Sequence, residues 1–243
     1  MLSLSKFIAQ TGTCSRRKAV DLIKRGSVTV NGHLITEPGH KIESKDVVKV
    51  DNKIIKQESK VYILLNKPRG YVTSTKNEEN RKTVMDLITG EIRGRVYPVG
   101  SLDTIATGLL VMTNDGDLIQ QLSRPGKKVK EVYQVILTTP LKDMDIAEIK
   151  RGIHLSDGTV EVKSIRRVQD NAATLSIDNM RHRAIVRLFE SLGYLIKRLN
   201  RLEYAGLTTK GLPINEWRFL TSDEVLELKE IAQKNRVKNQ SKS

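Results

Sequence analysis

Cysteine, soft-metal motifs and long apolar runs are scarce or missing in this chain of 243 residues. Its one cysteine, Cys14, excludes an internal disulfide framework and suits a reducing compartment. Four scattered histidines without a CxxC or HExxH pattern argue against a zinc site. No window approaches the ~18 consecutive apolar residues of a membrane helix, and the N-terminus lacks the apolar core of a signal peptide. We therefore expect a cytoplasmic protein with no metal and no membrane partner.

The phosphate-binding motifs of nucleotide cofactors are also missing. No GxGxxG follows a predicted strand, and no GxxxxGK[ST] occurs anywhere in the chain. The segment "TNDGD" resembles such a loop, but its residues are more typical of a turn. The chain thus lacks the phosphate-binding loops that are usual in enzymes of hydride transfer and nucleotide hydrolysis. We therefore expect no cofactor.

Positive charge is what the chain has in excess. Lys and Arg number 42 against 28 Asp and Glu, which gives a net charge of +14. Such an excess favours a polyanionic partner, because each neutralised phosphate releases a condensed counterion. A basic protein without any such partner is the alternative. Nucleic acid is the leading expectation.

Residues 1–50 form a pattern of their own. A short helix is predicted to end at Gly12, and Ser15 is a natural N-cap for a second helix that stops at Gly26. The pair Asn31-Gly32 is a strong hairpin signal, and "DVVKVD" supplies another strand. We expect a small α/β domain over 1–50, followed by a polar linker over 51–60.

Basic residues crowd the second of these helices. A solvated face is the usual reason for charge on a helix, but five cations in so short a segment repel one another unless an anion lies against them. We expect this helix to contact RNA or DNA. The five residues are Arg16, Arg17, Lys18, Lys24 and Arg25.

Residues 61–234 alternate strand and helix patterns without a regular βαβ order. Strands are predicted at 61–66, 108–113, 132–138, 160–165, 173–177 and 195–202, and helices at 83–89, 116–123, 142–151, 181–192 and 222–233. This order predicts an α+β fold with a mixed, mainly antiparallel sheet flanked by helices. The polar tail, residues 235–243, is expected to be disordered.

One carboxylate stands in an unusual place, within "YPVGSLDTIATGLLVMTNDGD". Asp103 is predicted to lie in a loop that buried segments hold at both ends. An aspartate so placed is either a structural turn-former or a positioned catalytic group. The residues alone leave both readings open.

A dense group of arginines forms the other informative block, "NMRHRAIVRLFESLGYLIKRLNR". The apolar residues fall on one helical face, and the arginines point elsewhere. A solvated basic face is again the alternative, but the planar fork of arginine suits phosphate oxygens. We expect phosphate contacts from this block, which includes Arg181, Arg183, Arg187, Arg198 and Arg201.

Six collinear segments of the chain carry a resemblance to one family. They are "SRRKAVDLIKRGSVTVNG", "LLNKPRGYVTS", "VGSLDTIATGLLVMTNDGDL", "VYQVIL", "RHRAIVRLFESLGY" and "GLPINEWRFLTSDEV". In this order they resemble the bacterial pseudouridine synthases of small-subunit or large-subunit ribosomal RNA that begin with an S4 RNA-binding domain. The resemblance implies an S4-like domain over 1–50 and a catalytic domain over 61–234.

The resemblance also implies a chemistry that needs neither metal nor cofactor. The enzymes break the bond from ribose to N1 of a flipped uracil, rotate the base and rejoin it through C5. By resemblance, Asp103 is the essential carboxylate, acting either as a nucleophile or as the base that takes the 2′ proton. Tyr133 would stack on the uracil and take the C5 proton, Gly108 would let the chain pass close behind the aspartate, and Arg69 would add to the grip on RNA.

Three positions depart from the family pattern. Ser101 stands where the family has an arginine, Glu131 stands where it has a basic residue, with Lys130 one place off, and Val186 stands where the arginine that pairs with the aspartate is expected. A buried carboxylate without a cation is costly. Arg183 or Arg187 would have to replace the missing partner.

Two main hypotheses follow. The first is an active, monomeric uridine isomerase that acts on ribosomal RNA or a pre-ribosomal particle, supported by the retained Asp103, Thr107, Gly108 and Tyr133. The second is a catalytically weakened relative that binds ribosomal RNA as an assembly factor. A DNA-binding regulator has little support beyond the charge, because no recognition-helix pattern is present.

Overall fold

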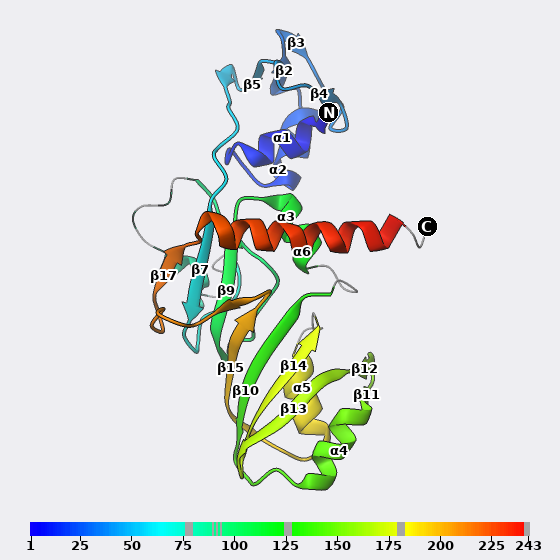
Figure 1. The fold of residues 1–243 in the computed structure, drawn as a ribbon. Coiled ribbons are helices and arrows are strands. Elements are labelled where there is room, and N and C mark those ends of the chain that lie inside the picture. Colours follow the sequence, from blue (N-terminus) through cyan, green and yellow to red (C-terminus); the bar gives the residue numbers. More distant parts are fainter. Residues whose placement is uncertain are drawn as a thin grey trace. The chain divides into compact units, whose positions relative to one another are not determined.

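The computed structural model describes residues 1–75, 80–88, 90, 92, 94–123, 128–178 and 183–240 (Figure 1). The chain divides into two compact units. Unit 1 comprises Met1–Val61 with Arg93–Arg95, and unit 2 comprises Tyr62–Ile92 with Val96–Ser243. Arg181, one of the expected phosphate contacts, lies outside the described residues.

Unit 1 packs two helices against short strands. The chain forms β1 (Leu2–Ser3), α1 (Leu4–Gln10), α2 (Arg16–Lys24), β2 (Val28–Val30), β3 (His33–Leu34), β4 (Lys41–Ile42), β5 (Val48–Val50) and β6 (Lys53–Ile54). Strands β3-β2-β5-β6 form an antiparallel sheet, and β1 pairs with β4. Its core joins Leu4 and Ile8 of α1 to Leu22 and Ile23 of α2 and to Val28 of β2.

The local signals in unit 1 act as the sequence predicts. The Ser15 side chain accepts a hydrogen bond from the Lys18 backbone N–H at 3.3 Å and so caps α2. Asn31 and Gly32 both have positive φ, 52° and 87°, as a tight hairpin turn between β2 and β3 requires.

The linker predicted over 51–60 starts before the folded part of unit 1 has ended. Strand β6 lies inside that range and pairs with β5, so Lys53 and Ile54 belong to the sheet of unit 1. Asp51 and Asn52 have φ of 47° and 64° and form the two-residue turn between these strands. Their polar character indicated a linker, but Asp and Asn also tolerate the left-handed conformation that such a turn needs.

Unit 2 is built on a mixed, mainly antiparallel sheet, in agreement with the expected α+β class. Nine of its described strands join in one sheet with the central order β13-β14-β10-β15-β9-β7-β17, while β16 pairs with β15 and β8 with β9. Among the described strands of this sheet, β15 pairs with β9 in parallel, and the other pairings are antiparallel. The strands are β7 (Tyr62–Lys67), β8 (Tyr97–Pro98), β9 (Ala106–Thr113), β10 (Lys130–Leu137), β13 (Val162–Gln169), β14 (Ala172–Asp178), β15 (Ile196–Tyr204), β16 (Leu207–Thr208) and β17 (Trp217–Phe219).

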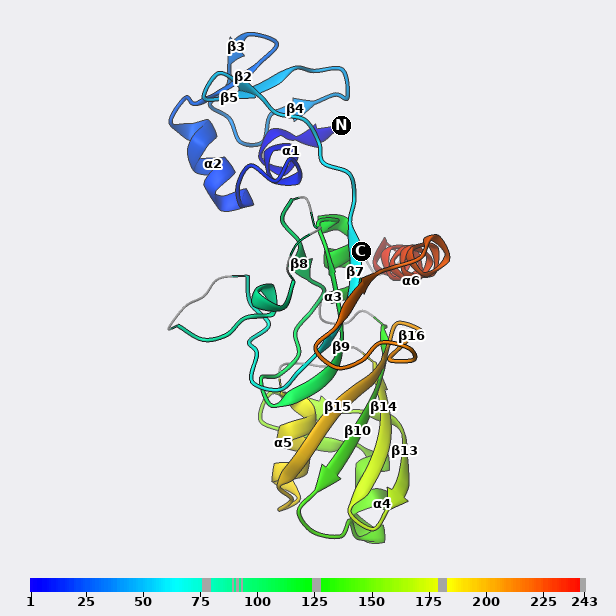
Figure 2. The same cartoon turned by 90° about the vertical axis from the view of Figure 1, so that its left-hand side faces the viewer.

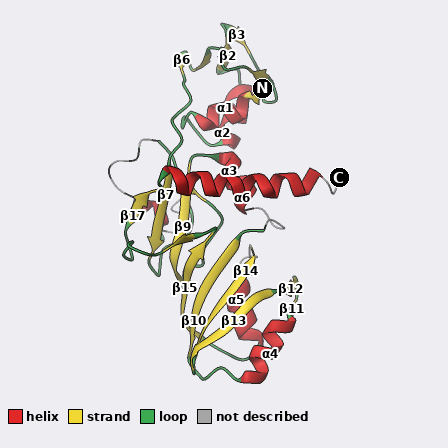
Figure 3. Ribbon diagram, in the orientation of Figure 1, coloured by secondary structure: helices red, strands yellow, loops and turns green. Residues whose placement is uncertain are grey.

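Two apolar clusters hold helices against this sheet (Figures 1 and 3). In the first, α4 (Asp143–Arg151) and α5 (Ala184–Ser191) pack against β10, β13, β14 and β15 (Figure 2). In the second, α3 (Gly116–Ser123) and α6 (Ser222–Gln240) pack together and cover β7 and β9. The short strands β11 (Ile153–Leu155) and β12 (Gly158–Val160) form a separate hairpin.

Two helices differ from the expected ones. The helix predicted at 83–89 is a single 3₁₀ turn, η1 (Val84–Leu87). Thr83 and Asp86 form a capping box at its start. Helix α6 runs to Gln240, so the tail expected to be disordered from residue 235 is helical up to that point. Asn235 is buried and its amide bonds both the N–H and the C=O of Lys128, which gives the polar segment a reason to stay folded.

Candidate active site

Asp103 lies in the loop between β8 and β9, and its two carboxylate oxygens face different partners. Its Oδ1 accepts a hydrogen bond from the Ile105 N–H at 3.0 Å, and this bond stabilises the turn. The other oxygen, Oδ2, faces a cation. Leu102, just before it, is buried and exchanges two hydrogen bonds with the Thr73 hydroxyl, at 2.7 and 3.2 Å. The loop therefore holds the carboxylate in one orientation.

Gly108 allows β9 to pass close to β15 behind this loop. Its φ is +110°, and a Cβ atom built there would stand 2.3 Å from the carbonyl oxygen of Arg201. Any side chain would therefore separate the two parallel strands. The neighbouring Thr107 hydroxyl lies 3.0 Å from Asn200 Oδ1, which adds a polar tie between the same strands.

Arg183 supplies the cation for Asp103. Its Nε lies 3.0 Å from Asp103 Oδ2, and the two side chains are 46% and 15% exposed. Arg183 is the N-cap of α5 and has φ of 55°, an uncommon backbone conformation for this residue type. Val186, at the position where an arginine was expected, is buried among apolar side chains. The cation thus comes from three residues earlier in the chain.

Arg187, the other candidate for this pairing, is engaged elsewhere. Its guanidinium makes a bidentate pair with Asp157, at 2.8 and 2.9 Å. This pair raises the pKa of Arg187 above its ordinary value. Between the two arginines that could replace the missing partner, the structure brings Arg183 to the aspartate.

A cavity of about 330 Å³ opens beside this ion pair. It is lined by Asp103, Glu131, Tyr133, Arg183 and Arg201 together with apolar side chains of α5 and β15. This size falls at the lower end of small-molecule sites. Ser101, where an arginine was expected, also lies at its wall.

Tyr133 reaches this cavity from β10. Every second residue of that strand is buried, so Glu131 and Tyr133 lie on the same face of the sheet. The Tyr133 hydroxyl donates a hydrogen bond to Glu131 Oε2 at 2.7 Å. Burial first, and then the charge of Glu131, raise the pKa of Tyr133 well above its ordinary value.

Glu131 and Arg201 form a buried ion pair across β10 and β15. Arg201 Nη1 lies 3.1 Å from Glu131 Oε2, and both side chains are no more than 5% exposed. Arg201 Nε also donates to the Leu109 carbonyl at 2.7 Å. Burial alone would lower the pKa of Arg201, but Tyr133 and Glu131 raise it above its ordinary value. Arg201 therefore stays charged, and its burial rules out the surface phosphate contact expected of it.

Lys67 is a further buried cation that the sequence did not single out. It ends β7, is 0% exposed and donates hydrogen bonds to the carbonyls of Pro68 and Tyr71, at 3.1 and 3.0 Å. Burial lowers the pKa of Lys67 to about 8, against the opposing effect of Asp103. The turn that it holds is joined to the Asp103 loop, because the Gly70 N–H donates to the Thr104 carbonyl at 2.8 Å.

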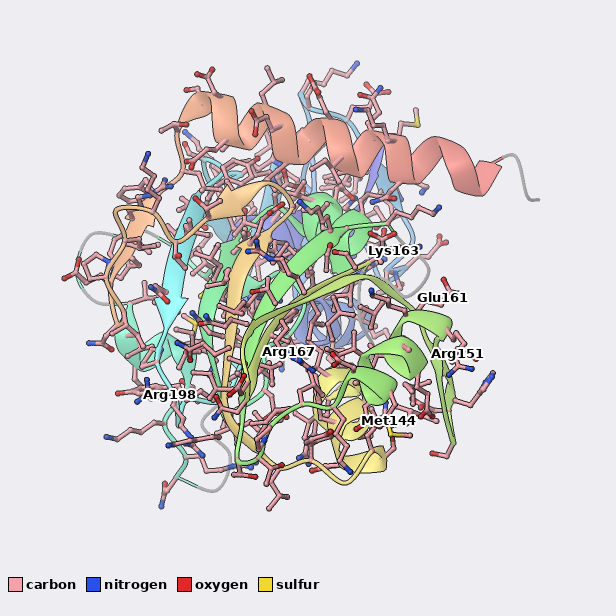
Figure 4. All side chains as sticks on the ribbon, turned by 60° about the horizontal axis from the view of Figure 1, so that its bottom comes forward. Met144, Arg151, Glu161, Lys163, Arg167 and Arg198 are labelled. Carbon is pink, nitrogen blue, oxygen red and sulfur yellow. The ribbon has the colours of Figure 1, made fainter. Side chains whose placement is uncertain are left out.

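The remaining basic residues of the expected set lie at the surface of their units. In unit 1, all five cations on α2 and at its C-cap are exposed: Arg16, Arg17, Lys18, Lys24 and Arg25. In unit 2, Arg69 and Arg198 are exposed, and Figure 4 shows Arg198 among the projecting side chains together with Arg151 and Lys163. These positions are open to a large anionic partner.

The described ranges hold neither a membrane-crossing helix nor a cluster of metal ligands. No helix there has both the length and the apolar character that a bilayer crossing requires. No three His, Cys, Asp or Glu side chains in the same ranges gather as the ligands of a metal ion would.

Two parts of the chain match models of known protein families. Residues 61–188 match the family model described as RNA pseudouridylate synthase, and residues 3–48 match the S4 domain. The chain therefore belongs to the RNA pseudouridylate synthase family, with an S4 domain in unit 1.

Individual relatives match over nearly the whole chain. Ribosomal large subunit pseudouridine synthase B of Bacillus subtilis (strain 168) is 37% identical over 239 residues, which cover 96% of this chain and 97% of the relative. Dual-specificity RNA pseudouridine synthase RluF of Escherichia coli (strain K12) is 34% identical over 229 residues, which cover 93% of this chain and 77% of that relative. A crystal structure of a pseudouridylate synthase matches with a TM-score of 0.68 at 26% identity, covering 94% of this chain and 100% of that one.

Proposed function

We propose that this chain isomerises a specific uridine of ribosomal RNA to pseudouridine. The observation that carries the proposal is the ion pair of Asp103 with Arg183, which opens into a cavity that Tyr133 also lines. Membership of the RNA pseudouridylate synthase family supports the reaction, and the name of the Bacillus subtilis relative supports ribosomal RNA as the substrate.

The reaction needs a uridine taken out of its stack, because a base inside folded RNA is out of reach of the cavity. The flipped uracil would enter beside Asp103 and lie against the ring of Tyr133. Asp103 then assists the break between N1 and C1′, either by attacking as a nucleophile or by taking the 2′ proton. The base turns, C5 bonds to C1′, C5 loses its proton and N1 gains one.

Arg183 gives the carboxylate its partner for this step. A guanidinium at 3.0 Å offsets the negative charge of Asp103 and fixes the direction of Oδ2. Preorganised charge of this kind is what most enzymes use to stabilise a charged transition state. The pair supports the proposal despite Val186, because it brings a cation from another residue of the same segment to the carboxylate.

Surface cations would hold the RNA while this occurs. Seven exposed cations suit phosphate contacts. They are Arg16, Arg17, Lys18 and Lys24 of α2, Arg25 at its C-cap, Arg69 and Arg198. Arg183 is occupied at the cavity and Arg187 is paired with Asp157, so they would contribute less to this grip. We further propose that the protein works as a cytoplasmic monomer on ribosomal RNA or a pre-ribosomal particle.

A catalytically weakened assembly factor is the second candidate. The departures at Ser101, Glu131 and Val186 favour it, because each removes a basic group that the family pattern has near the site. It predicts RNA binding without any new pseudouridine.

One experiment separates the two candidates. Unmodified ribosomal RNA is incubated with the protein, and pseudouridine is mapped by chemical modification and primer extension. The enzyme proposal predicts a defined modified uridine with the wild type and none with Asp103→Asn. Asp143→Asn is the matched control, because Asp143 is also an aspartate paired with an arginine, Arg167, but is exposed. No modified site with the wild type would sink the enzyme proposal.

A further inference from the structure

Two side chains in the wall of the cavity share one carboxylate oxygen of a third. Glu131 Oε2 accepts the hydroxyl of Tyr133 at 2.7 Å and the guanidinium of Arg201 at 3.1 Å. All three residues line the cavity, and each is at most 6% exposed. The phenol of Tyr133 therefore has a single fixed direction, and its proton points at Glu131.

A buried tyrosine can take a proton only if it gives up its own. Burial and the charge of Glu131 raise the pKa of Tyr133 well above its ordinary value, so the phenol keeps its proton near neutral pH. A neutral phenol is a poor base unless an acceptor removes its proton as another arrives. The described neighbours place Glu131 Oε2 at that position.

Arg201 accounts for the presence of a carboxylate at such depth. An ionised carboxylate without a partner is costly to bury, and a guanidinium partner offsets part of that cost. Arg201 is fixed in turn by the Leu109 carbonyl at 2.7 Å and by the ring of Tyr204, whose centroid lies 4.7 Å from Cζ. The acceptor is thus held in place and lies away from bulk water.

We propose that Glu131 acts through Tyr133 as the proton acceptor of the final step, with Arg201 holding it in place. This inference rests on the proposed isomerisation. As C5–H breaks, its proton goes to Tyr133 Oη and the phenolic proton passes to Glu131 Oε2. The electron pair of the C5–H bond re-forms the C5=C6 double bond, and the π pair of the N1=C6 double bond, present once C5 is joined to C1′, returns to N1.

The protons then balance. N1 takes up one proton, and Glu131 gives up the one it received, so the enzyme returns to its starting state and the base keeps its composition. The step needs only a weak acceptor, because the C5 proton sits on a saturated carbon next to a carbonyl and its loss restores conjugation. A carboxylate paired with an arginine is sufficient for such a proton.

The test uses single-turnover pseudouridine formation with ribosomal RNA that carries protium or deuterium at C5 of uridine. In Glu131→Gln the rate is expected to fall on the order of 10²-fold. It should also show a primary deuterium isotope effect larger than that of the wild type. A rate close to that of the wild type overturns the relay, and so does a lower rate without a larger isotope effect, because both would leave Glu131 with a structural role only.

Glu203→Gln is the matched control. Glu203 pairs with Lys130 at 3.0 Å across the same two strands, β10 and β15, but nearer the surface. It should leave both the rate and the isotope effect unchanged.

A second variant covers the loss of stability that an unpaired Arg201 would cause. Glu131→Gln combined with Arg201→Met removes both buried charges, and such replacements are often tolerated. It should show the same enlarged isotope effect if it folds, and a normal one overturns the relay. An inactive wild type would instead reject the isomerisation itself, so the two failures are distinguishable.

Discussion

At the scale of single residues, the candidate site is defined by the pairing of its charged side chains. Asp103 is paired with Arg183, Glu131 with Arg201, and Lys67 is buried within electrostatic reach of Asp103. The sequence pointed to Asp103 and Tyr133 through motifs. It could not show that Arg201 turns inward, because its partner lies 70 positions away. Alternation along β10 was the available signal, since it puts Glu131 beside Tyr133.

Removing the cation at Asp103 should impair the reaction more than RNA binding. In Arg183→Met the carboxylate loses its partner at 3.0 Å, and we expect the single-turnover rate to fall on the order of 10²-fold. RNA affinity should change little. Arg151→Met is the control, because Arg151 is an exposed arginine on α4. Equal rates for Arg183→Met and the wild type would show that Asp103 needs no cation.

The burial of Lys67 should appear in the pH dependence of stability. Its pKa is lowered from 10.5 to about 8, so between these values the unfolded chain binds more protons than the folded one. Burial of the charged Lys67 amine therefore destabilises the fold fully below about pH 8. Above that pH the destabilisation decreases, so the free energy of unfolding rises.

The measurement compares urea unfolding of the wild type and Lys67→Met at intervals from about pH 7.5 to about pH 9.5. This window stays below the range where the buried tyrosines would oppose the effect, because their pKa values are raised from 10. The wild type should gain stability relative to Lys67→Met across it. A constant difference between the two proteins would contradict the assignment.

At the scale of elements, helices and strands followed the sequence closely where periodicity was strong. Strands β7, β9, β10, β14 and β15 and helices α3, α4 and α5 lie within a few residues of the predicted ranges. The misses have local causes. A polar composition concealed the hairpin turn at Asp51 and Asn52, and contacts with Lys128 keep the end of α6 folded past Asn235. Such contacts depend on the tertiary structure, which periodicity does not encode.

The parallel contact between β9 and β15 makes a sharp prediction for one glycine. Gly108→Ala should lower the free energy of unfolding by about 3 kcal/mol or more, because it combines a positive φ with a steric clash. Gly116→Ala is the matched control. It lies at the start of α3 with nothing within 4 Å of the added atom, and it should be neutral or slightly stabilising. Urea unfolding of both variants measures the difference, and similar values would contradict the close approach.

At the scale of the whole molecule, the chain joins an S4 domain to a pseudouridylate synthase domain. Each has its own apolar core and its own set of exposed cations. The net charge of +14 is thus shared between a unit without the candidate cavity and the unit that contains it. We expect unit 1 to contribute affinity for RNA and unit 2 the chemistry.

This division predicts a change in salt dependence. Replacing Arg16, Arg17 and Lys18 together by Gln should reduce the slope of log K against log salt concentration by about 2, as the loss of three phosphate contacts would. The single-turnover rate at saturating protein should stay the same. Lys45→Gln, an exposed cation of unit 1 outside α2, is the control. An unchanged slope would place the RNA contacts elsewhere.

We propose that Asp103 makes this chain an isomerase of uridine. The measurement that tests this role is the amount of pseudouridine formed per ribosomal RNA molecule in a single turnover, for the wild type and Asp103→Asn at protein concentrations that saturate the RNA. We expect close to one pseudouridine at one position with the wild type and none with the variant, although both bind the RNA equally. Equal product from both proteins, or none from the wild type, would contradict it.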